Sequence, residues 1–293
     1  GTIFIAGPTI VAPAINLNVP IDAPPLLPLL FVTIACGAIS GFHGLVGSGT
    51  TSKQLDRETD ARFVGYLGST GEGALALAAI IATTAGFASF EEWRAVYTNF
   101  ESGGLAAFIQ GGATIVSDGS GLTHNTAATL LTVMAVLFAG TTMDTAVRLQ
   151  RYVVQEWGTI YRIPVFRNSY FATFVAVGAC LALAFGAGGR DLTGGMVLWP
   201  IFGTTNQLLA SITLLVISVV LVRLGRPARY TLIPMVFVST VALVSALYQL
   251  FVLYRTSQYV LLLIDAAIVI SAVFVMLEAF SAFNQRSKPA SVA

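Results

Sequence analysis

Seven apolar stretches, each about as long as a helix that crosses a bilayer, constrain this chain more than any other feature. They occupy residues 28–51, 64–87, 122–147, 164–188, 195–222, 231–254 and 258–282. A spanning helix needs about 20 mainly apolar residues. Only 10% of the 293 residues are charged, whereas soluble domains carry about 25%. We therefore predict an all-α polytopic membrane protein, with residues 1–293 forming a single transmembrane domain.

The basic residues support this topology, because nearly all of them fall in loops on one side of the predicted spans. The loops of that side hold Lys53, Arg57, Arg62, Arg148, Arg151, Arg162, Arg167, Arg223, Arg226, Arg229, Arg286 and Lys288. The other side holds only Arg94, Arg190 and Arg255. Basic loops stay in the cytoplasm, so the C-terminus is predicted to be cytoplasmic. The first residues resemble the tail of another membrane segment, and we expect further protein upstream.

Several other classes of function find no support in the sequence. The net charge of +1 is spread along the chain, which argues against a nucleic-acid partner. Paired-histidine zinc motifs, phosphate-binding Gly-Lys-Ser/Thr loops and Gly-x-Ser-x-Gly elbows are absent. We therefore expect no enzyme, no metal and no cofactor. An intramembrane hydrolase would need Asp144 and Asp265 as a pair, and nothing in the sequence places them together. Cys36 and Cys180 lie in apolar runs and are predicted to be buried packing residues.

Glycine and polar residues interrupt the first predicted span about halfway along, at residues 40–51 (SGFHGLVGSGTT). Each glycine costs a helix about 1 kcal/mol relative to alanine. Backbone that leaves the helix at membrane depth survives only where protein buries it or where it lines a watery cavity. We therefore predict a discontinuous helix at a solute or ion site. The side chains and backbone predicted to contact the solute or ion from this segment are Ser40, Gly41, His43, Ser48, Thr50 and Thr51.

Ionisable residues inside the spans are candidates for carrying a coupled proton. Histidine titrates near neutral pH, and His43 lies in the interrupted span. Glu72 lies about nine residues into the second span, roughly 13 Å deep and close to the middle of the bilayer. Such residues usually face a cavity, although each could instead be a buried hydrogen-bonded structural residue. Asp265, the lone acid near the outer third of the last span, has the same two interpretations.

A second interruption is predicted at residues 198–207 (LWPIFGTTNQ). Pro200 lacks an amide donor and Gly203 follows within a turn, so the helix should kink or break there. Asn206 and Gln207 would then line the cavity. The alternative is a helix whose polar residues hold neighbouring helices together.

Two further features concern the edges of the membrane domain. Asp144 and Arg148 lie four residues apart and should face together, either as an interfacial ion pair or as an inner gate. Residues 89–121 are predicted to form an external loop. This loop contains an amphipathic piece, and a short apolar run (LAAFIQ) that either dips into the membrane or stays part of the loop.

The chain resembles the carbon starvation protein (CstA) family in several ordered segments. These are residues 37–43 (GAISGFH), 48–54 (SGTTSKQ), 58–62 (ETDAR), 143–148 (MDTAVR) with Arg151 and Tyr152, 198–203 (LWPIFG) and 206–210 (NQLLA). The resemblance extends from about Ala6 to Arg226. Gly44 and Gly47 stand where the family commonly has serine, and the connection over residues 89–121 is shorter than in some members.

The resemblance implies a proton-coupled importer of short peptides or pyruvate-like carboxylates in the bacterial inner membrane. It also implies an inverted-repeat symporter, in which two discontinuous helices frame a site near the midplane. The partner of the interrupted first span would then lie in an N-terminal half that this sequence lacks. That half, the lipid bilayer, the solute and the coupling proton are the expected partners. The rival hypothesis is a solute-sensing membrane module that binds without transport.

Overall fold

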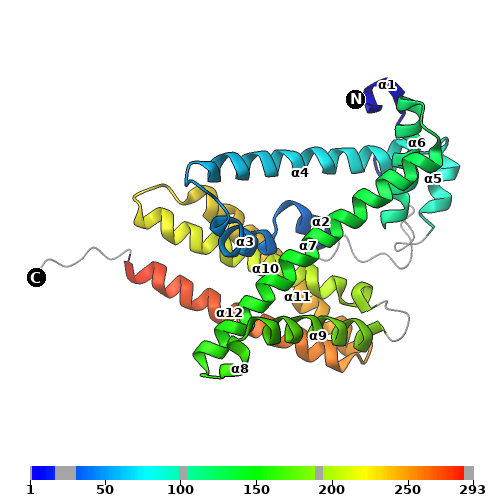
Figure 1. Cartoon of the computed structure of the whole chain (residues 1–293). Helices are drawn as coiled ribbons and strands as arrows, with labels where there is room; N and C mark the ends of the chain where they lie inside the picture. Colours follow the sequence, from blue (N-terminus) through cyan, green and yellow to red (C-terminus); the bar gives the residue numbers. More distant parts are fainter. Residues whose placement is uncertain (1, 17–30, 99–103, 189–193, 287–293) are drawn as a thin grey trace, which may run out of the picture. The chain divides into compact units, whose positions relative to one another are not determined.

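The computed structural model describes residues 2–16, 31–98, 104–188 and 194–286. Most of the described residues are helical, and there is no strand among them (Figure 1). The elements are α1 (Thr2–Ala6), α2 (Phe31–Ala38), α3 (Gly41–Gly49), η2 (Thr51–Lys53), α4 (Asp60–Ala85), α5 (Phe90–Val96), α6 (Gly104–Ser120), α7 (His124–Ile160), α8 (Pro164–Arg167), α9 (Ser169–Gly188), α10 (Gly194–Arg223), α11 (Arg229–Arg255) and α12 (Tyr259–Arg286).

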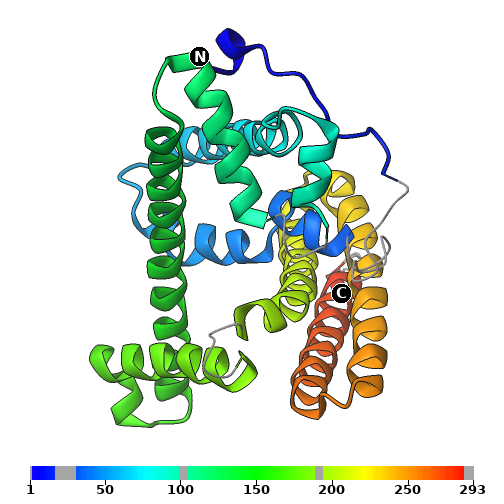
Figure 2. The same ribbon diagram turned by 90° about the vertical axis from the view of Figure 1, so that its right-hand side faces the viewer.

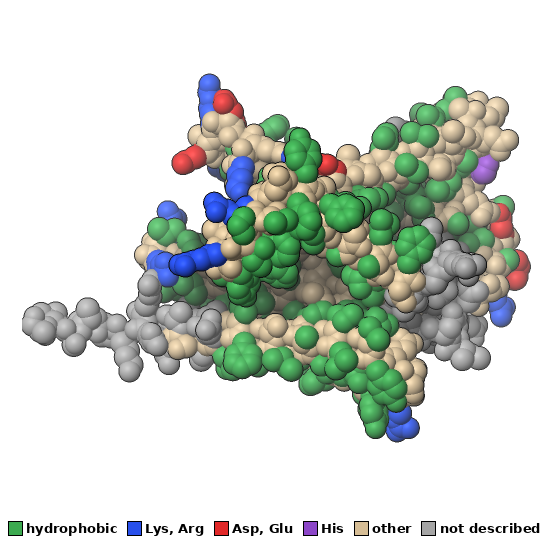
Figure 3. All heavy atoms as spheres, turned by 60° about the horizontal axis from the view of Figure 1, so that its bottom comes forward, with side chains coloured by type: hydrophobic (Ala, Val, Ile, Leu, Met, Phe, Trp, Pro, Cys, Tyr) green, Lys and Arg blue, Asp and Glu red, His purple; other side chains and the backbone are tan. Residues whose placement is uncertain are grey.

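The predicted all-α polytopic membrane protein is confirmed. Among the described residues, 7 segments are long and apolar enough to cross a membrane, and each overlaps one of the predicted spans. They are Phe31–Lys53, Asp60–Ala85, His124–Ile160, Ser169–Gly186, Leu198–Arg223, Arg229–Arg255 and Tyr259–Leu277. In the space-filling view, apolar side chains cover much of the visible face (Figure 3). Of the basic residues in the charge pattern, Arg190 and Lys288 lie outside the described residues.

The chain forms two compact units. The first consists of residues 1–23 and 54–146, and the second of residues 24–53 and 147–293. That these units work as one transmembrane domain stays a prediction.

In the first unit α6 packs against α1 and α4. Small residues permit the contact with α4, because a side chain at Gly111 would strike the backbone of Ala82 and one at Gly86 would strike Gly111 itself. The segment predicted as an external loop, residues 89–121, is largely helical. Its amphipathic piece is α5, and its short apolar run belongs to α6.

In the second unit α10 is the central helix, packed by α2, α3, α9, α11 and α12. The helices α10, α11 and α12 lie side by side (Figures 1 and 2). Leu208, Ala242 and Ala272, one from each, form a core cluster. The small alanines allow the three helices to approach closely, as small residues commonly do in membrane bundles.

Two helices differ from the expected boundaries. The helix α10 runs uninterrupted through Pro200, so the predicted break in this helix is absent. The helix α7 has 37 residues and is therefore roughly 55 Å long. That length exceeds the bilayer core of about 30 Å. The helix α7 therefore extends beyond the membrane core, and the part beyond the predicted end at residue 147 carries Arg148 and Arg151.

Candidate functional site

The predicted interruption of the first span is present as a break between α2 and α3. The helix α2 ends at Ala38, and Ser40 caps the N-terminus of α3 by accepting a hydrogen bond from the His43 amide. The glycine-rich stretch that follows is itself helical, so the break is confined to Ile39 and Ser40. A helix that ends and restarts leaves backbone N–H and C=O groups without partners inside the helix.

Two side chains of α10 bind these freed backbone groups. The Oδ1 atom of Asn206 accepts the backbone N–H of Phe42 at 2.8 Å and the hydroxyl of Ser40 at 3.2 Å. The neighbouring Gln207 donates from Nε2 to the backbone oxygen of Ile39 at 2.8 Å. Asn206 and Gln207 are 3% and 2% exposed. They therefore hold both sides of the break in a buried polar contact.

Cys36 takes part in the same contact. Its sulfur accepts a hydrogen bond from Nδ2 of Asn206 at 2.9 Å. Cys36 is half-buried, whereas Cys180 is exposed and donates to Oε1 of Gln150 at 3.4 Å. The prediction that both cysteines are buried packing residues is therefore wrong. Each sulfur takes part in a polar contact.

Glycines let α3 lie directly against α10. A side-chain carbon at Gly41 would come within 2.5 Å of the Ala210 nitrogen and the Asn206 oxygen, and one at Gly44 within 2.8 Å of Thr213. Gly41 and Gly44 are three residues apart and so share one face of α3. This face cannot carry side chains without moving the helix away from α10.

The remaining predicted ligands of α3 have different surroundings. His43 and Ser48 are exposed, and Thr50 is 6% exposed. The hydroxyls of Ser48 and Thr50 donate to backbone oxygens within α3, at 2.9 Å to Gly44 and 3.0 Å to Val46. Their lone pairs remain able to accept from a solute or to bind a cation. Thr51 begins η2 and is partly exposed.

The other predicted residues lie on different elements. Glu72 is exposed on α4, in the first compact unit. Asp144 and Arg148 are one turn apart on α7, with Asp144 exposed and Arg148 partly exposed. Of the predicted site residues, the structure thus brings together Ser40, Gly41, Asn206 and Gln207.

A second set of buried polar residues includes Gln249, which was not predicted from the sequence as a site residue. Thr204 donates to Oε1 of Gln249 at 3.1 Å, and both residues are buried between α10 and α11. Asp265 on α12 is also completely buried. The sequence could have indicated Gln249 as clearly as Asp265, because each is a polar residue within an otherwise apolar span.

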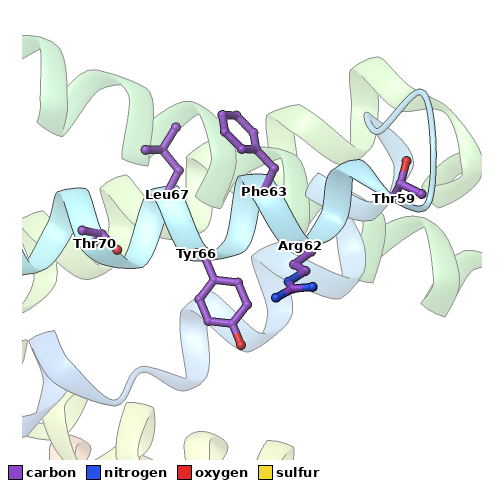
Figure 4. Close-up of a pocket in the computed structure, with 6 residues that line it drawn as sticks. All are labelled: Thr59, Arg62, Phe63, Tyr66, Leu67 and Thr70. Atoms are coloured by element: carbon purple, nitrogen blue, oxygen red, sulfur yellow. The ribbon is translucent and has the colours of Figure 1, made fainter.

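A surface hollow of about 550 Å³ lies along α4 (Figure 4). Its lining residues are Thr59, Arg62, Phe63, Tyr66, Leu67 and Thr70. Five of them belong to α4 and Thr59 is its N-cap, and Arg62 and Tyr66 point to the side opposite Phe63 and Leu67 (Figure 4). The hollow does not converge polar groups from several elements, so it is not the candidate site. Among the described residues, no group of three or more His, Cys, Asp or Glu side chains is placed to hold a metal ion.

The fold and the capped break define a polytopic helical membrane protein with a discontinuous spanning helix. The family described as carbon starvation protein CstA matches residues 1–99 and 91–245. The chain belongs to this family.

Curated relatives carry transporter names. A "Peptide transporter CstA" of Helicobacter pylori strain J99 is 32% identical over 275 residues, covering 76% of this chain and 40% of the relative. Another of that name, from Campylobacter jejuni, is 34% identical over 278 residues, covering 78% and 39%. The "Pyruvate/proton symporter BtsT" of Escherichia coli K12 is 56% identical over 59 residues, covering 20% and 8%. The chain spans about two fifths of the length of the first two relatives. No solved structure matches the chain.

Proposed function

We propose that this chain is part of a secondary transporter that imports pyruvate-like carboxylates or short peptides together with protons. The break between α2 and α3, held by two side chains of α10, is the observation that carries the proposal. Discontinuous helices are how many secondary transporters build a solute site near the bilayer midplane. The names of the relatives agree with it, because they include peptide transporters and a pyruvate/proton symporter.

The solute carboxylate, the group that pyruvate and peptides share, is assigned to the region of the α3 N-terminus. Because Asn206 and Ser40 accept the Phe42 and His43 amides, the attraction there comes from the helix dipole. A helix N-terminus carries a partial positive charge that favours anions. Ser40 lies at this end, and His43 is exposed one turn further along. Ser40, Gly41, His43, Ser48, Thr50 and Thr51 contact the solute or coupling ion in this proposal. Asn206 and Gln207 hold the break in shape from α10.

Proton coupling and gating are assigned to ionisable residues. His43 and Glu72 carry the coupling proton, and the pair Asp144 and Arg148 forms an inner gate on α7. Transport follows alternating access, with solute and proton binding on one side and leaving on the other. A proton that moves down the membrane potential contributes about 2.3 kcal/mol per 100 mV. In this arrangement the protein lies in the bacterial inner membrane with its C-terminus in the cytoplasm, as the basic loops predict.

The test is uptake of labelled pyruvate and of a labelled dipeptide into proteoliposomes with an imposed pH gradient. The complete native protein should accumulate one of the two solutes against its gradient, and an uncoupler should abolish the accumulation. Binding of the solute without accumulation would replace the transporter with the solute-sensing module.

Site variants test the residue assignments separately. His43→Ala and Glu72→Gln should each lower gradient-driven uptake at least tenfold. Glu156→Gln, which neutralises an exposed acid on α7, should leave uptake unchanged. Uptake that is normal in both the His43 and the Glu72 variants contradicts these assignments while leaving transport itself intact.

A further inference from the structure

The bundle of α10, α11 and α12 contains buried polar groups that the helix break does not use. Asp265 on α12 is 0% exposed, and neither of its carboxyl oxygens has a hydrogen-bond partner among the described residues. Ser245 on α11 is also 0% exposed, and its hydroxyl likewise has no partner in the described part of the chain. Burying a carboxylate without a partner is very costly. The carboxyl therefore needs a proton or another cation.

Helix packing fixes which residues lie level with Asp265. Ala242 of α11 and Ala272 of α12 meet in the core cluster, and a short turn joins the two helices (Figure 2). Asp265 precedes Ala272 by seven residues, and Gln249 follows Ala242 by seven. Seven residues are about two helical turns, so Asp265 and Gln249 lie at one level on the faces that pack together. Ser245 lies one turn from Gln249 on the same face.

The groups around this level are polar but neutral. The side-chain oxygen of Gln249 accepts the hydroxyl of Thr204 from α10 at 3.1 Å. Thr204 and Gln249 are 1% and 4% exposed. Since that oxygen is already engaged, few oxygens remain for a metal cation, which binds through several at once. A proton needs only one.

Among the described residues, neither carboxyl oxygen of Asp265 has a hydrogen-bond partner, a cationic one included. Residues 198–222, 230–254 and 260–277 contain no Lys, Arg, His or second acid, and neither do α2 and α9, which also pack on α10. The helix α3 packs on α10 as well and carries His43. The other titratable residues of α2, α9, α10, α11 and α12 are the thiols Cys36 and Cys180, five phenols, and the residues Arg223, Arg229, Arg255, Glu278 and Arg286 toward the helix ends. The phenols are Tyr170, Tyr230, Tyr248, Tyr254 and Tyr259, all at least 40% exposed. At the end of α11, the exposed Arg255 guanidinium stacks over Phe251 at 5.1 Å.

We propose that Asp265 is a proton-carrying residue of the transporter, in addition to the candidates in the broken span and on α4. Its carboxyl holds the coupling proton while α12 is packed as described here. When α12 moves relative to α10 and α11 and water reaches the carboxyl, its O–H bond breaks and the proton passes to water. This inference rests on the proposed proton-coupled transport.

The test compares two transport modes of the complete native protein in proteoliposomes. Solute exchange at equal pH needs no net proton movement, whereas accumulation under a pH gradient does. Asp265→Asn keeps the size of the side chain but cannot release a proton. We expect it to exchange solute within about threefold of wild type and to lose gradient-driven accumulation at least tenfold. Asp265→Glu should retain part of the accumulation, and Glu156→Gln should behave as wild type in both modes.

Each contrary result has its own meaning. If Asp265→Asn still accumulates solute under the gradient, the carboxyl does not carry the proton. If this variant loses exchange as well, Asp265 has a structural role instead, and the inference is again wrong. Accumulation that follows a sodium gradient rather than a pH gradient also overturns it. A wild-type protein that moves no solute in either mode would refute the proposed function itself.

Discussion

Asn206 on α10 accepts the backbone N–H of Phe42 at the start of α3, with 2.8 Å between nitrogen and oxygen. The same amide oxygen accepts the Ser40 hydroxyl, and the amide nitrogen donates to Cys36. One buried side chain therefore replaces three hydrogen bonds that water would otherwise supply. This makes a break in the spanning helix compatible with an apolar environment.

Removing this amide should destabilise the fold. In Asn206→Leu, the Phe42 amide loses its acceptor, and an unsatisfied buried group costs about 1–3 kcal/mol. Thermal unfolding in detergent should show a lower midpoint for this variant. Thr205→Val is the matched control, because among the described residues the Thr205 hydroxyl donates to the Ile201 backbone oxygen within α10 and makes no hydrogen bond with the break. Equal losses in the two variants would mean that the cap has no special role.

The contact between α3 and α10 can be tested with a glycine pair on one helix. In Gly41→Ala, the new carbon would come within 2.5 Å of backbone atoms of α10, whereas in Gly47→Ala it would have no atom within 4 Å. The first variant should lower stability by roughly 1–3 kcal/mol, as overpacking does. The second should be neutral or stabilising by up to about 1 kcal/mol. Unfolding midpoints that do not separate the two variants would contradict this contact.

One aromatic ring links η2 to α7. The Lys53 ammonium and the Arg151 guanidinium lie 5.0 Å and 5.1 Å from the Tyr152 ring centre. Such contacts are worth about 0.5–1 kcal/mol each at exposed sites. Tyr152→Leu should free η2 and speed tryptic cleavage after Lys53 about threefold. Tyr152→Phe keeps the ring and should cleave like wild type, so faster cleavage of this variant would point to the hydroxyl instead.

Burial raises the pKa of the Tyr97 phenol above its usual value of 10.0. Because the folded state holds this proton more tightly, the stability it contributes is fully present below about pH 10 and is lost as pH rises through the folded pKa. Tyrosinate absorbance during an alkaline titration should show Tyr97 ionising above the usual phenol pKa of 10.0. The difference between wild type and Tyr97→Phe isolates this group.

Much of the fold could be predicted from local patterns, because a spanning helix is recognised by its length and hydropathy. All seven segments lie where the apolar stretches predicted them. The sequence pattern placed the break correctly at Ser40, but it predicted an interruption over residues 40–51, whereas α3 is helical from Gly41 to Gly49. Helix propensity alone disfavours glycine in α3. Gly41 and Gly44 are nevertheless helical, because the absence of their side chains lets α3 pack closely against α10. The helix α10 is likewise continuous through Pro200 despite the missing amide donor.

The site was harder to predict because its contacts join residues far apart in the chain. The polar character of Asn206 and Gln207 was visible, and their role as caps depends on α3 lying alongside α10. Asp265 stood out as a lone acid, whereas its level relative to Gln249 follows only from the packing of α11 against α12. The arrangement of His43 and Glu72 stays a prediction, because they belong to different compact units.

The cap on α3 also sets an order for biosynthesis. Phe42 and Asn206 are 164 residues apart in the chain, which a ribosome covers in roughly 10–30 s at typical elongation rates. Throughout that interval Asn206 and Gln207 have not yet been synthesised, so the hydrogen bonds that they give to the break are missing. We expect the nascent α2 and α3 segments to stay near the translocon or headgroup water until α10 arrives.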